Sequence, residues 1–276
     1  MNRCFGIIGG DRRQGALAEL LEADGHTVYS YGLPGRQTGS LDQAAAAPVV
    51  VLPLPLCRGE GVLNCQEAPL PTAELFRHFH PGQRLLAGKV EAEQRREAEE
   101  RGLALEDYFC REALTVANAA ATAEGAVQTA MERLDRTLLG MDCLVLGFGR
   151  IGRLLSCRLH GLGARVSAAA RRPEDLAWVR AYGWQALEIS RLDGNLSSFG
   201  AVFNTVPSPV LDGPLLAQLP SECLCVDLAS RQGIDLEAAR ELGLPHVWAR
   251  SLPGRLTPRT AAAAIRDTVY YMLREG

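Results

Sequence analysis

The N-terminal part of the chain alternates short apolar runs with amphipathic stretches, which is typical of an α/β domain. Four apolar runs, each followed by a glycine or a proline, predict strands at residues 4–8, 26–31, 48–54 and 83–87. The stretches between and after them predict helices at residues 12–23, 72–79 and 91–101. Strands that alternate with helices in this way pair in parallel through right-handed crossovers.

The same alternation continues to the C-terminus. Apolar runs predict strands at residues 144–146, 164–170, 201–206, 222–228 and 246–249, and the segments between them predict helices at residues 150–161, 214–219 and 236–242. The longest helical pattern covers residues 119–139, and we expect it to link two domains. A final helix is predicted at residues 257–274, with Thr257 as its N-cap and Pro258 in its first turn.

These elements predict an α/β protein of two domains, and a length of 276 residues suits two cores of ordinary size. We assign residues 1–118 to a substrate domain, the smaller of the two and Rossmann- or flavodoxin-like. Residues 119–256 are assigned to a Rossmann-type domain with a doubly wound parallel sheet. By analogy with two-domain dehydrogenases, we expect the C-terminal helix, residues 257–276, to join the first domain.

The segment LVLGFGRIG, residues 144–152, combines an apolar strand with the spacing G-x-G-x-x-G and a helix start. Gly147 is expected to make the tight turn, Gly149 to let a pyrophosphate approach the backbone, and Gly152 to let the helix pack closely on the strand. The helix N-terminus would offer N–H groups and a partial positive charge to the phosphates. Because a second strand follows at the right distance, the motif favours dinucleotide binding over a simple glycine-rich turn.

Two arginines follow the second strand of this domain and indicate which dinucleotide binds. An NAD site usually has an acidic residue there, which accepts from the ribose 2′-hydroxyl, whereas an NADP site has arginine near the 2′-phosphate. This chain has Arg171 and Arg172 and no carboxylate at that point. The pair favours NADP(H), since guanidinium groups bind a phosphate dianion by bidentate hydrogen bonds. The alternative is two arginines on a solvated loop.

Composition excludes several other functions. The 29 basic and 32 acidic residues give a formal net charge of −3 with no basic stripe, so we expect neither nucleic acid nor an anionic membrane as a partner. No apolar run is long enough for a membrane span and the N-terminus has no signal-peptide pattern, so we expect a cytoplasmic protein. The eight cysteines are scattered without a C-x-x-C motif, which predicts reduced core thiols and no metal site.

Open parallel sheets bind ligands at the carboxyl ends of their strands. The segment GGDRRQ, residues 9–14, is either an anion cradle in which Arg12 or Arg13 reaches a carboxylate, or a ligand-free turn. Asn204 and Thr205 close another strand, where they are expected to contact the nicotinamide ribose or carboxamide. Asp227 ends an apolar strand and needs a partner, so we expect it to be structural and paired with a loop.

Two further loops carry charged residues. In residues 57–61, Arg58 is a candidate for binding and Glu60 for acid–base chemistry, although the segment is better explained as a solvated loop. Residues 251–258 are predicted to be a loop in which Leu-Pro-Gly fixes a turn and Arg255 projects.

Seven segments of the chain together resemble one known family, the A subunit of dipicolinate synthase. They occur in the family's order and at similar spacing, and they extend over nearly the whole chain. The segments are GGDRRQ at 9–14, RGEGV at 58–62, TAEGA at 122–126, LVLGFGRIG at 144–152, FNTVPS at 203–208, VDLASRQG at 226–233 and LPGRLTPRTA at 252–261.

The resemblance implies an NADP-dependent oxidoreductase of sporulation. Its substrate would be the heterocycle made from aspartate semialdehyde and pyruvate, which is dihydrodipicolinate or its hydroxy-tetrahydro precursor, and its product dipicolinate. The resemblance also implies a flavoprotein-like partner, the B subunit of dipicolinate synthase, together with an oligomeric assembly and a location in the mother-cell cytoplasm. A dicarboxylate substrate of this kind suits arginines at strand ends.

Residue roles follow from the motifs and the resemblance together. For NADP(H) we expect contacts from Gly147, Gly149, Arg150, Ile151, Gly152, Arg171, Arg172, Asn204, Thr205, Val206 and Pro207. The expected carboxylate binders are Arg13, Arg231 and Arg255, and the candidate proton acceptors are Glu60, Glu124 and Asp11. Two alternatives stay open. One is a two-domain NAD(P)-dependent dehydrogenase of another small carboxylate, and the other is a non-catalytic NADP-binding regulatory protein.

Overall fold

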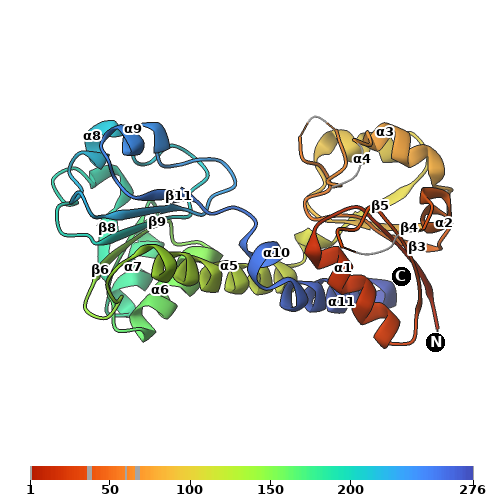
Figure 1. The fold of residues 1–276 in the computed structure, drawn as a ribbon, viewed down its shortest axis with the longest axis horizontal. Helices are drawn as coiled ribbons and strands as arrows, with labels where there is room; N and C mark the ends of the chain where they lie inside the picture. The colour runs from red at the N-terminus through yellow and green to blue at the C-terminus, as the bar shows by residue number, and fades with distance from the viewer. Residues whose placement is uncertain (1, 36–38, 60, 66–68, 276) are drawn as a thin grey trace. The chain divides into compact units, whose positions relative to one another are not determined.

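The chain folds into two compact units, each built on one parallel sheet (Figure 1). The structure, a computed structural model, describes residues 2–35, 39–59, 61–65 and 69–275. The first unit comprises residues 1–118 and 253–276, and the second comprises residues 119–252. Residues 253–256, which the sequence-based division assigned to the second domain, therefore lie in the first unit. A close contact explains this, because a Cβ on Gly254 would lie 2.5 Å from Oδ2 of Asp11.

The sheet of the first unit has the order β2-β1-β3-β4-β5, and every pair of neighbouring strands is parallel. Its strands are β1 Cys4–Ile8, β2 Thr27–Tyr31, β3 Val49–Val51, β4 Arg84–Ala87 and β5 Ala104–Asp107. The helices of this unit are α1 Arg12–Ala23, α2 Leu41–Ala45, α3 Thr72–Leu75, α4 Ala92–Glu99, α10 Leu252–Leu256 (whose first residue belongs to the second unit) and α11 Pro258–Glu275, with short 3₁₀ helices η1 Phe76–His78 and η2 Tyr108–Cys110.

Alternation along the strands gives this first sheet a core on each face. Phe5 and Ile7 of β1 pack with residues of α1 and α11, and these two helices lie side by side in Figure 1. Ile8 points to the other face, where it belongs to a cluster with residues of α2, α3 and α4. Gly6 is required on that face, because a Cβ there would lie 1.9 Å from the carbonyl oxygen of Ala44.

The sheet of the second unit has the order β11-β10-β9-β6-β7-β8, which is the doubly wound Rossmann order. Its strands are β6 Asp142–Leu146, β7 Arg165–Ala170, β8 Gln185–Glu188, β9 Ala201–Asn204, β10 Leu224–Asp227 and β11 His246–Trp248. The helices are α6 Arg150–Gly161, α7 Pro173–Ala181, α8 Gly213–Leu216 and α9 Leu236–Glu241, with the 3₁₀ helix η3 Ile189–Arg191. The predicted fold class of two parallel-sheet α/β units is confirmed. Proteins with this strand order bind their ligands where the order reverses, which here is beside the central strand β6.

Several local predictions need correction. The long helix α5, Glu112–Arg133, begins and ends earlier than the predicted span of residues 119–139. Its first turn contains the acidic residue Glu112, which stabilises a helix N-terminus, and beyond its end Leu138 is buried in an irregular segment. Residues 252–256 form helix α10 although a loop was predicted. Four elements were not predicted: strands β5 and β8 and helices α2 and α7. The two strands are short and half polar, so they lack an apolar run. Among the described residues, no helix is both long and apolar enough to cross a membrane.

Candidate functional site

The glycine loop of the second unit joins the central strand β6 to helix α6. Gly147 has a φ of +94°, which favours glycine, and its N–H donates to the carbonyl of Ala169 at 2.8 Å. A Cβ on Gly147 would lie 2.4 Å from Oγ1 of Thr205. A Cβ on Gly152 would lie 2.0 Å from the carbonyl oxygen of Gly147. Both glycines are therefore required by the packing of the protein itself.

Gly149 differs from its two neighbours in the motif. It is the N-cap of α6 and makes no side-chain cap, and the first turn of the helix contains no acidic residue. A Cβ at this position would meet no atom within 4 Å, so nothing in the described protein requires a glycine there. The first amides of a helix lack partners within the helix and attract anions. The open space and the uncapped N-terminus thus fit a phosphate group.

A cavity of about 460 Å³ lies beside this loop, within the size range of about 300–1,000 Å³ that small-molecule sites occupy. It brings together parts of the glycine loop, the end of β7, the start of α7 and the segment after β9. Its lining residues are Gly147, Phe148, Ala170, Arg171, Arg172, Asp175, Ile189, Val206, Pro207, Ser208 and Val210. Gly147, Arg171, Arg172, Val206 and Pro207 of the predicted cofactor residues line it, whereas Gly149, Arg150, Ile151 and Gly152 belong to the adjoining helix start.

The carboxylate of Asp175 organises the charges of this cavity. Arg172 donates to it through Nε at 2.8 Å and Nη2 at 3.1 Å, and Arg153 donates through Nη2 at 2.9 Å. These hydrogen bonds, that from Arg172 first and that from Arg153 next, hold the pKa of Asp175 below its usual value against the effect of its burial. Arg171 is exposed and makes no hydrogen bond or ion pair with any described residue. The cavity therefore has an excess of positive charge.

The side chains of Asn204 and Thr205 have a different role from the predicted one. Asn204 is fully buried, donates to the carbonyl of Val206 at 3.0 Å and accepts from the N–H of Val206 at 2.9 Å. Thr205 donates through Oγ1 to the carbonyl of Leu146 at 2.9 Å. Because these groups are committed within the protein, both side chains hold the segment after β9 in place, and neither is among the residues that line the cavity. They do not offer free side-chain donors to a nicotinamide.

Asp227 is structural, as its position at the end of an apolar strand predicted. Its carboxylate is fully buried and accepts hydrogen bonds at 2.7–3.0 Å from the amide of Asn204 and three backbone N–H groups. Such a full set of donors is what a buried carboxylate needs. The expected pairing with a loop is confirmed, and the backbone donors are Ala229, Gly233 and Ile234.

The corresponding turn in the first unit is closed by its own residues. The N–H of Gly9 donates to Tyr31 and that of Gly10 donates to Asn64, both to carbonyl oxygens. Asp11 caps α1 by accepting from the N–H of Arg13 at 2.9 Å. Of the two alternatives for residues 9–14, the structure favours the ligand-free turn over the anion cradle, since a carboxylate of the protein already occupies the helix N-terminus.

Arg13 does not have the free guanidinium group that binding a substrate carboxylate requires. It is 5% exposed, forms a two-pronged ion pair with Asp11 and also donates to the carbonyl of Leu54. Asp11 is correspondingly engaged and is a poor candidate for proton transfer. Arg12, the alternative that the sequence left open, is exposed and donates through Nη1 to the carbonyl of Arg255 at 3.2 Å.

The other predicted substrate and catalytic residues come from both units. Glu60 lies outside the described residues. Glu124 lies on α5, has a side chain that is 61% exposed and pairs with Arg158 at 2.9 Å. Arg231 follows β10, in the second unit, and Arg255 lies on α10, in the first, and both are exposed. Sequence reasoning missed Arg153 and Asp175. Arg153 sits on the predicted helix after the glycine motif, but only the fold shows that Asp175 reaches it.

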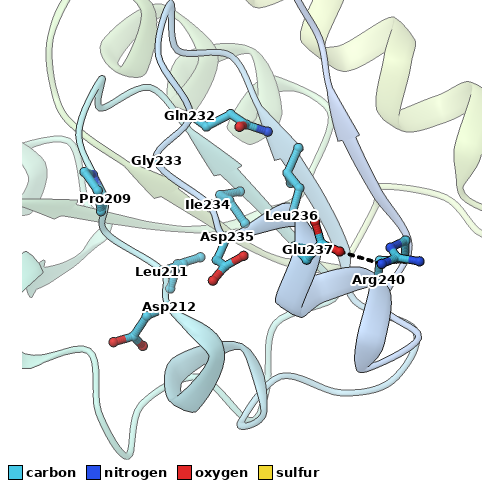
Figure 2. Close-up of a pocket in the computed structure, with 10 residues that line it drawn as sticks. All are labelled: Pro209, Leu211, Asp212, Gln232, Gly233, Ile234, Asp235, Leu236, Glu237 and Arg240. Carbon is cyan, nitrogen blue, oxygen red and sulfur yellow. Dashed lines mark hydrogen bonds and ion pairs between the residues drawn. The ribbon is translucent and has the colours of Figure 1, made fainter.

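A second cavity in the same unit, of about 490 Å³, lies between the segments 209–212 and 232–240 (Figure 2). It contains no residue of the glycine motif. Its acidic residues have structural partners: Asp212 accepts from the N–H of Leu215, Asp235 accepts from that of Ala238, and Glu237 pairs with Arg240 at 2.6 Å. We therefore assign the candidate site to the cavity of about 460 Å³ beside the glycine loop. No cluster of potential metal ligands occurs among the residues that the structure describes.

A family model and a curated relative both show similarity to the A subunit of dipicolinate synthase. Residues 4–109 match the family described as the N-terminal domain of the dipicolinate synthase A subunit. The A subunit of dipicolinate synthase from Bacillus subtilis (strain 168) is 27% identical over 98% of this chain and 95% of its own length. The resemblance inferred from the sequence motifs is thus confirmed.

Solved structures agree with this result. The crystal structure of the dipicolinate synthase A subunit from Bacillus halodurans covers 99% of this chain and 98% of that protein with a TM-score of 0.88 at 24% identity. The corresponding protein from Bacillus subtilis has a TM-score of 0.84 at 26% identity, covering 100% of this chain and 97% of that one. An L-alanine dehydrogenase, at a TM-score of 0.65 and 16% identity over 97% of this chain and 88% of that one, shares the fold. The chain therefore has the two-domain fold found among dehydrogenases.

Proposed function

We propose that this chain, which is similar along nearly its whole length to the A subunit of dipicolinate synthase, is the oxidoreductase component that forms dipicolinate with NADP⁺. The observation that most strongly supports this proposal is the uncapped N-terminus of α6 beside a cavity lined by Arg171 and Arg172. Its geometry fits the pyrophosphate of a dinucleotide at the helix and a second phosphate at the end of β7. The substrate class rests on the similarity of the whole chain.

The state of Asp175 supports NADP(H) rather than NAD(H). In an NAD site a free carboxylate accepts from the ribose 2′-hydroxyl. Among the residues that line the cavity, Asp175 is the only carboxylate, and both of its oxygens already accept from Arg153 and Arg172. Arg171, in contrast, has an unpaired guanidinium group among the described residues. A 2′-phosphate would find a donor here, whereas a 2′-hydroxyl would find no free carboxylate.

The proposed reaction requires the protein mainly to orient the substrate against the cofactor and to accept a proton. A dihydropyridine dicarboxylate loses a hydride and a proton and becomes an aromatic ring, and the nicotinamide of a bound cofactor would accept the hydride. The protein has to hold the donor carbon in place and remove a proton. We propose Arg231 and Arg255 for the carboxylates, because both are exposed, whereas the buried Arg13 is not proposed. Glu60 and Glu124 stay as candidate proton acceptors, whereas Asp11 is bound to Arg13.

The setting of the reaction is part of the same proposal. The similar Bacillus subtilis protein is named as one subunit of an enzyme, which suggests that a second chain completes the complex. We propose the flavoprotein-like B subunit of dipicolinate synthase as that partner. We further propose an oligomeric assembly in the mother-cell cytoplasm of a sporulating bacterium.

The test is an assay of the purified chain alone and with its partner. Freshly prepared substrate, from aspartate semialdehyde and pyruvate, is mixed with NADP⁺, and dipicolinate and NADPH are followed by their absorbance. We expect both to appear above the uncatalysed rate. Product formation only with the partner present would identify a chain that cannot act alone. Absence of dipicolinate in both mixtures, together with turnover of L-alanine or D-lactate, would replace the proposal by a dehydrogenase of another carboxylate.

A further inference from the structure

Three charged side chains connect the two ends of the candidate cofactor site. Arg153 donates through Nε to the carbonyl of Phe148, in the glycine loop, at 3.0 Å, and its guanidinium carbon lies 5.2 Å from the centre of the Phe148 ring. The same guanidinium donates to Asp175 at 2.9 Å. Asp175 in turn accepts from Arg172, which follows β7. One carboxylate therefore links the loop expected to hold the pyrophosphate with the residues expected to hold the 2′-phosphate.

Asp175 is buried while its two partners are not. Its side chain is 9% exposed, whereas those of Arg172 and Arg153 are 59% and 43% exposed. The carboxylate uses both oxygens and takes Nε and Nη2 of Arg172 in a fork, which fixes the plane of the guanidinium group. Nη1 of Arg172 has no partner among the described residues. It therefore remains available to a ligand in the cavity that Arg172 lines.

We infer that Asp175 is a positioning residue for cofactor discrimination, which holds Arg172 so that it and Arg171 present a preformed site to a phosphate on the ribose 2′-oxygen. Holding the side chain before binding reduces the conformational entropy that the complex must lose. Two arginines also neutralise Asp175, so that its charge does not repel a phosphate dianion. The inference rests on the proposed function in one respect, namely that NADP(H) is the cofactor.

A neighbouring residue provides a matched control. Glu174 lies in the same first turn of α7, has the same charge and approaches Nε of Arg172 only to 3.7 Å. It is exposed, and it does not contact Arg153 in the described structure. Both acids stabilise the helix N-terminus through its dipole. A comparison of Asp175→Asn with Glu174→Gln therefore separates the positioning of Arg172 from the loss of one negative charge.

The experiment measures dissociation constants for NADPH and NADH by fluorescence titration of the full chain, so that it requires no turnover. In Asp175→Asn we expect the preference for NADPH over NADH to fall about five- to tenfold, and in Glu174→Gln to change less than about twofold. In an Arg172→Ala background, Asp175→Asn should cause no further change in the preference, since it acts through Arg172. Arg172→Lys, which cannot form the fork, should reproduce the loss even if Asp175→Asn folds poorly.

The outcomes separate this inference from the proposed function. If the unmodified chain prefers NADPH and Asp175→Asn keeps that preference or strengthens it, the positioning role is overturned while NADP dependence stands. An equal loss in Asp175→Asn and Glu174→Gln also overturns it, because net charge alone would then explain the effect. A chain that binds NADH as well as NADPH overturns both. An additive loss in the Arg172→Ala background shows that Asp175 acts by another route and contradicts the inference.

Discussion

The two units each contain a strand, a glycine-rich turn and a twelve-residue helix, and these two turns differ in what occupies the helix N-terminus. In the first unit β1 leads through Gly9 and Gly10 into α1, whose N-terminus is capped by the carboxylate of Asp11. In the second unit β6 leads through the glycine loop into α6, whose N-cap is Gly149 without any side-chain cap. Both helices have the same length and no acidic residue in the first turn.

The comparison shows that glycines after a strand do not by themselves make an anion site. Glycine frees the backbone, but the amides bind a ligand only if no group of the protein reaches them first. In the first turn, Asp11 and the carbonyls of Tyr31 and Asn64 take those donors. In the second turn, a Cβ on Gly149 would meet no described atom within 4 Å beyond its chain neighbours and its own helix.

The largest effect is expected from Asp11→Ala in the first turn. The change removes the cap of α1 and leaves Arg13, which is 5% exposed, with the carbonyl of Leu54 as its one remaining acceptor among the described residues. We expect a loss of about 3 kcal/mol in the free energy of unfolding, from the cap and from the uncompensated buried charge together. Urea unfolding measures it. Asp11→Asn keeps a capping oxygen and should lose less, and a loss below about 1 kcal/mol in Asp11→Ala would show that the turn is not held by this carboxylate.

A somewhat smaller effect is expected from Gly152→Ala in the second turn. The new Cβ would lie 2.0 Å from the carbonyl oxygen of Gly147, and a backbone atom cannot move aside cheaply. We expect the free energy of unfolding to fall by about 2 kcal/mol, which is typical of overpacking. Gly149→Ala is the control, since its Cβ meets nothing within 4 Å and it should lose clearly less, about 0.5–1 kcal/mol from the replacement of glycine by alanine at an N-cap. Equal stability of Gly152→Ala and Gly149→Ala would contradict the close packing of α6 on the loop.

The sequence predicted the local structure of the second turn. The spacing of Gly147, Gly149 and Gly152 after an apolar run predicted the turn, the helix and the doubly wound sheet, because these features depend on residues close together in the chain. The structural role of Asp227 was also predictable, since a carboxylate at the end of an apolar strand needs hydrogen-bond donors from the protein.

Other parts depend on contacts that the sequence does not display. Arg13 was expected to bind a ligand, and only the structure shows that it turns back to Asp11 and Leu54, the latter 41 residues away. Asp175 was missed because its partners come from two different elements, α6 and the end of β7. Asn204 was expected to be exposed to the cofactor, but the parallel register of β9 and β10 places it opposite Asp227, which it binds. Polar residues at strand ends are thus predictable as a group, but their individual partners are not.

The smallest effect, and the most direct test of the comparison, is expected from Gly149→Asp. This change gives α6 the kind of cap that Asp11 gives α1, and it should raise the free energy of unfolding by only about a few tenths of a kcal/mol. Because a carboxylate would then occupy the amides proposed for the pyrophosphate, affinity for NADPH and NADH should fall together by about tenfold or more. Fluorescence titration measures both constants. Gly149→Asn separates charge from size: it offers the same capping oxygen without the charge, so it should lose less affinity. Unchanged affinity in Gly149→Asp would mean that the open N-terminus of α6 holds no phosphate, and the two turns would then differ in their caps but not in function.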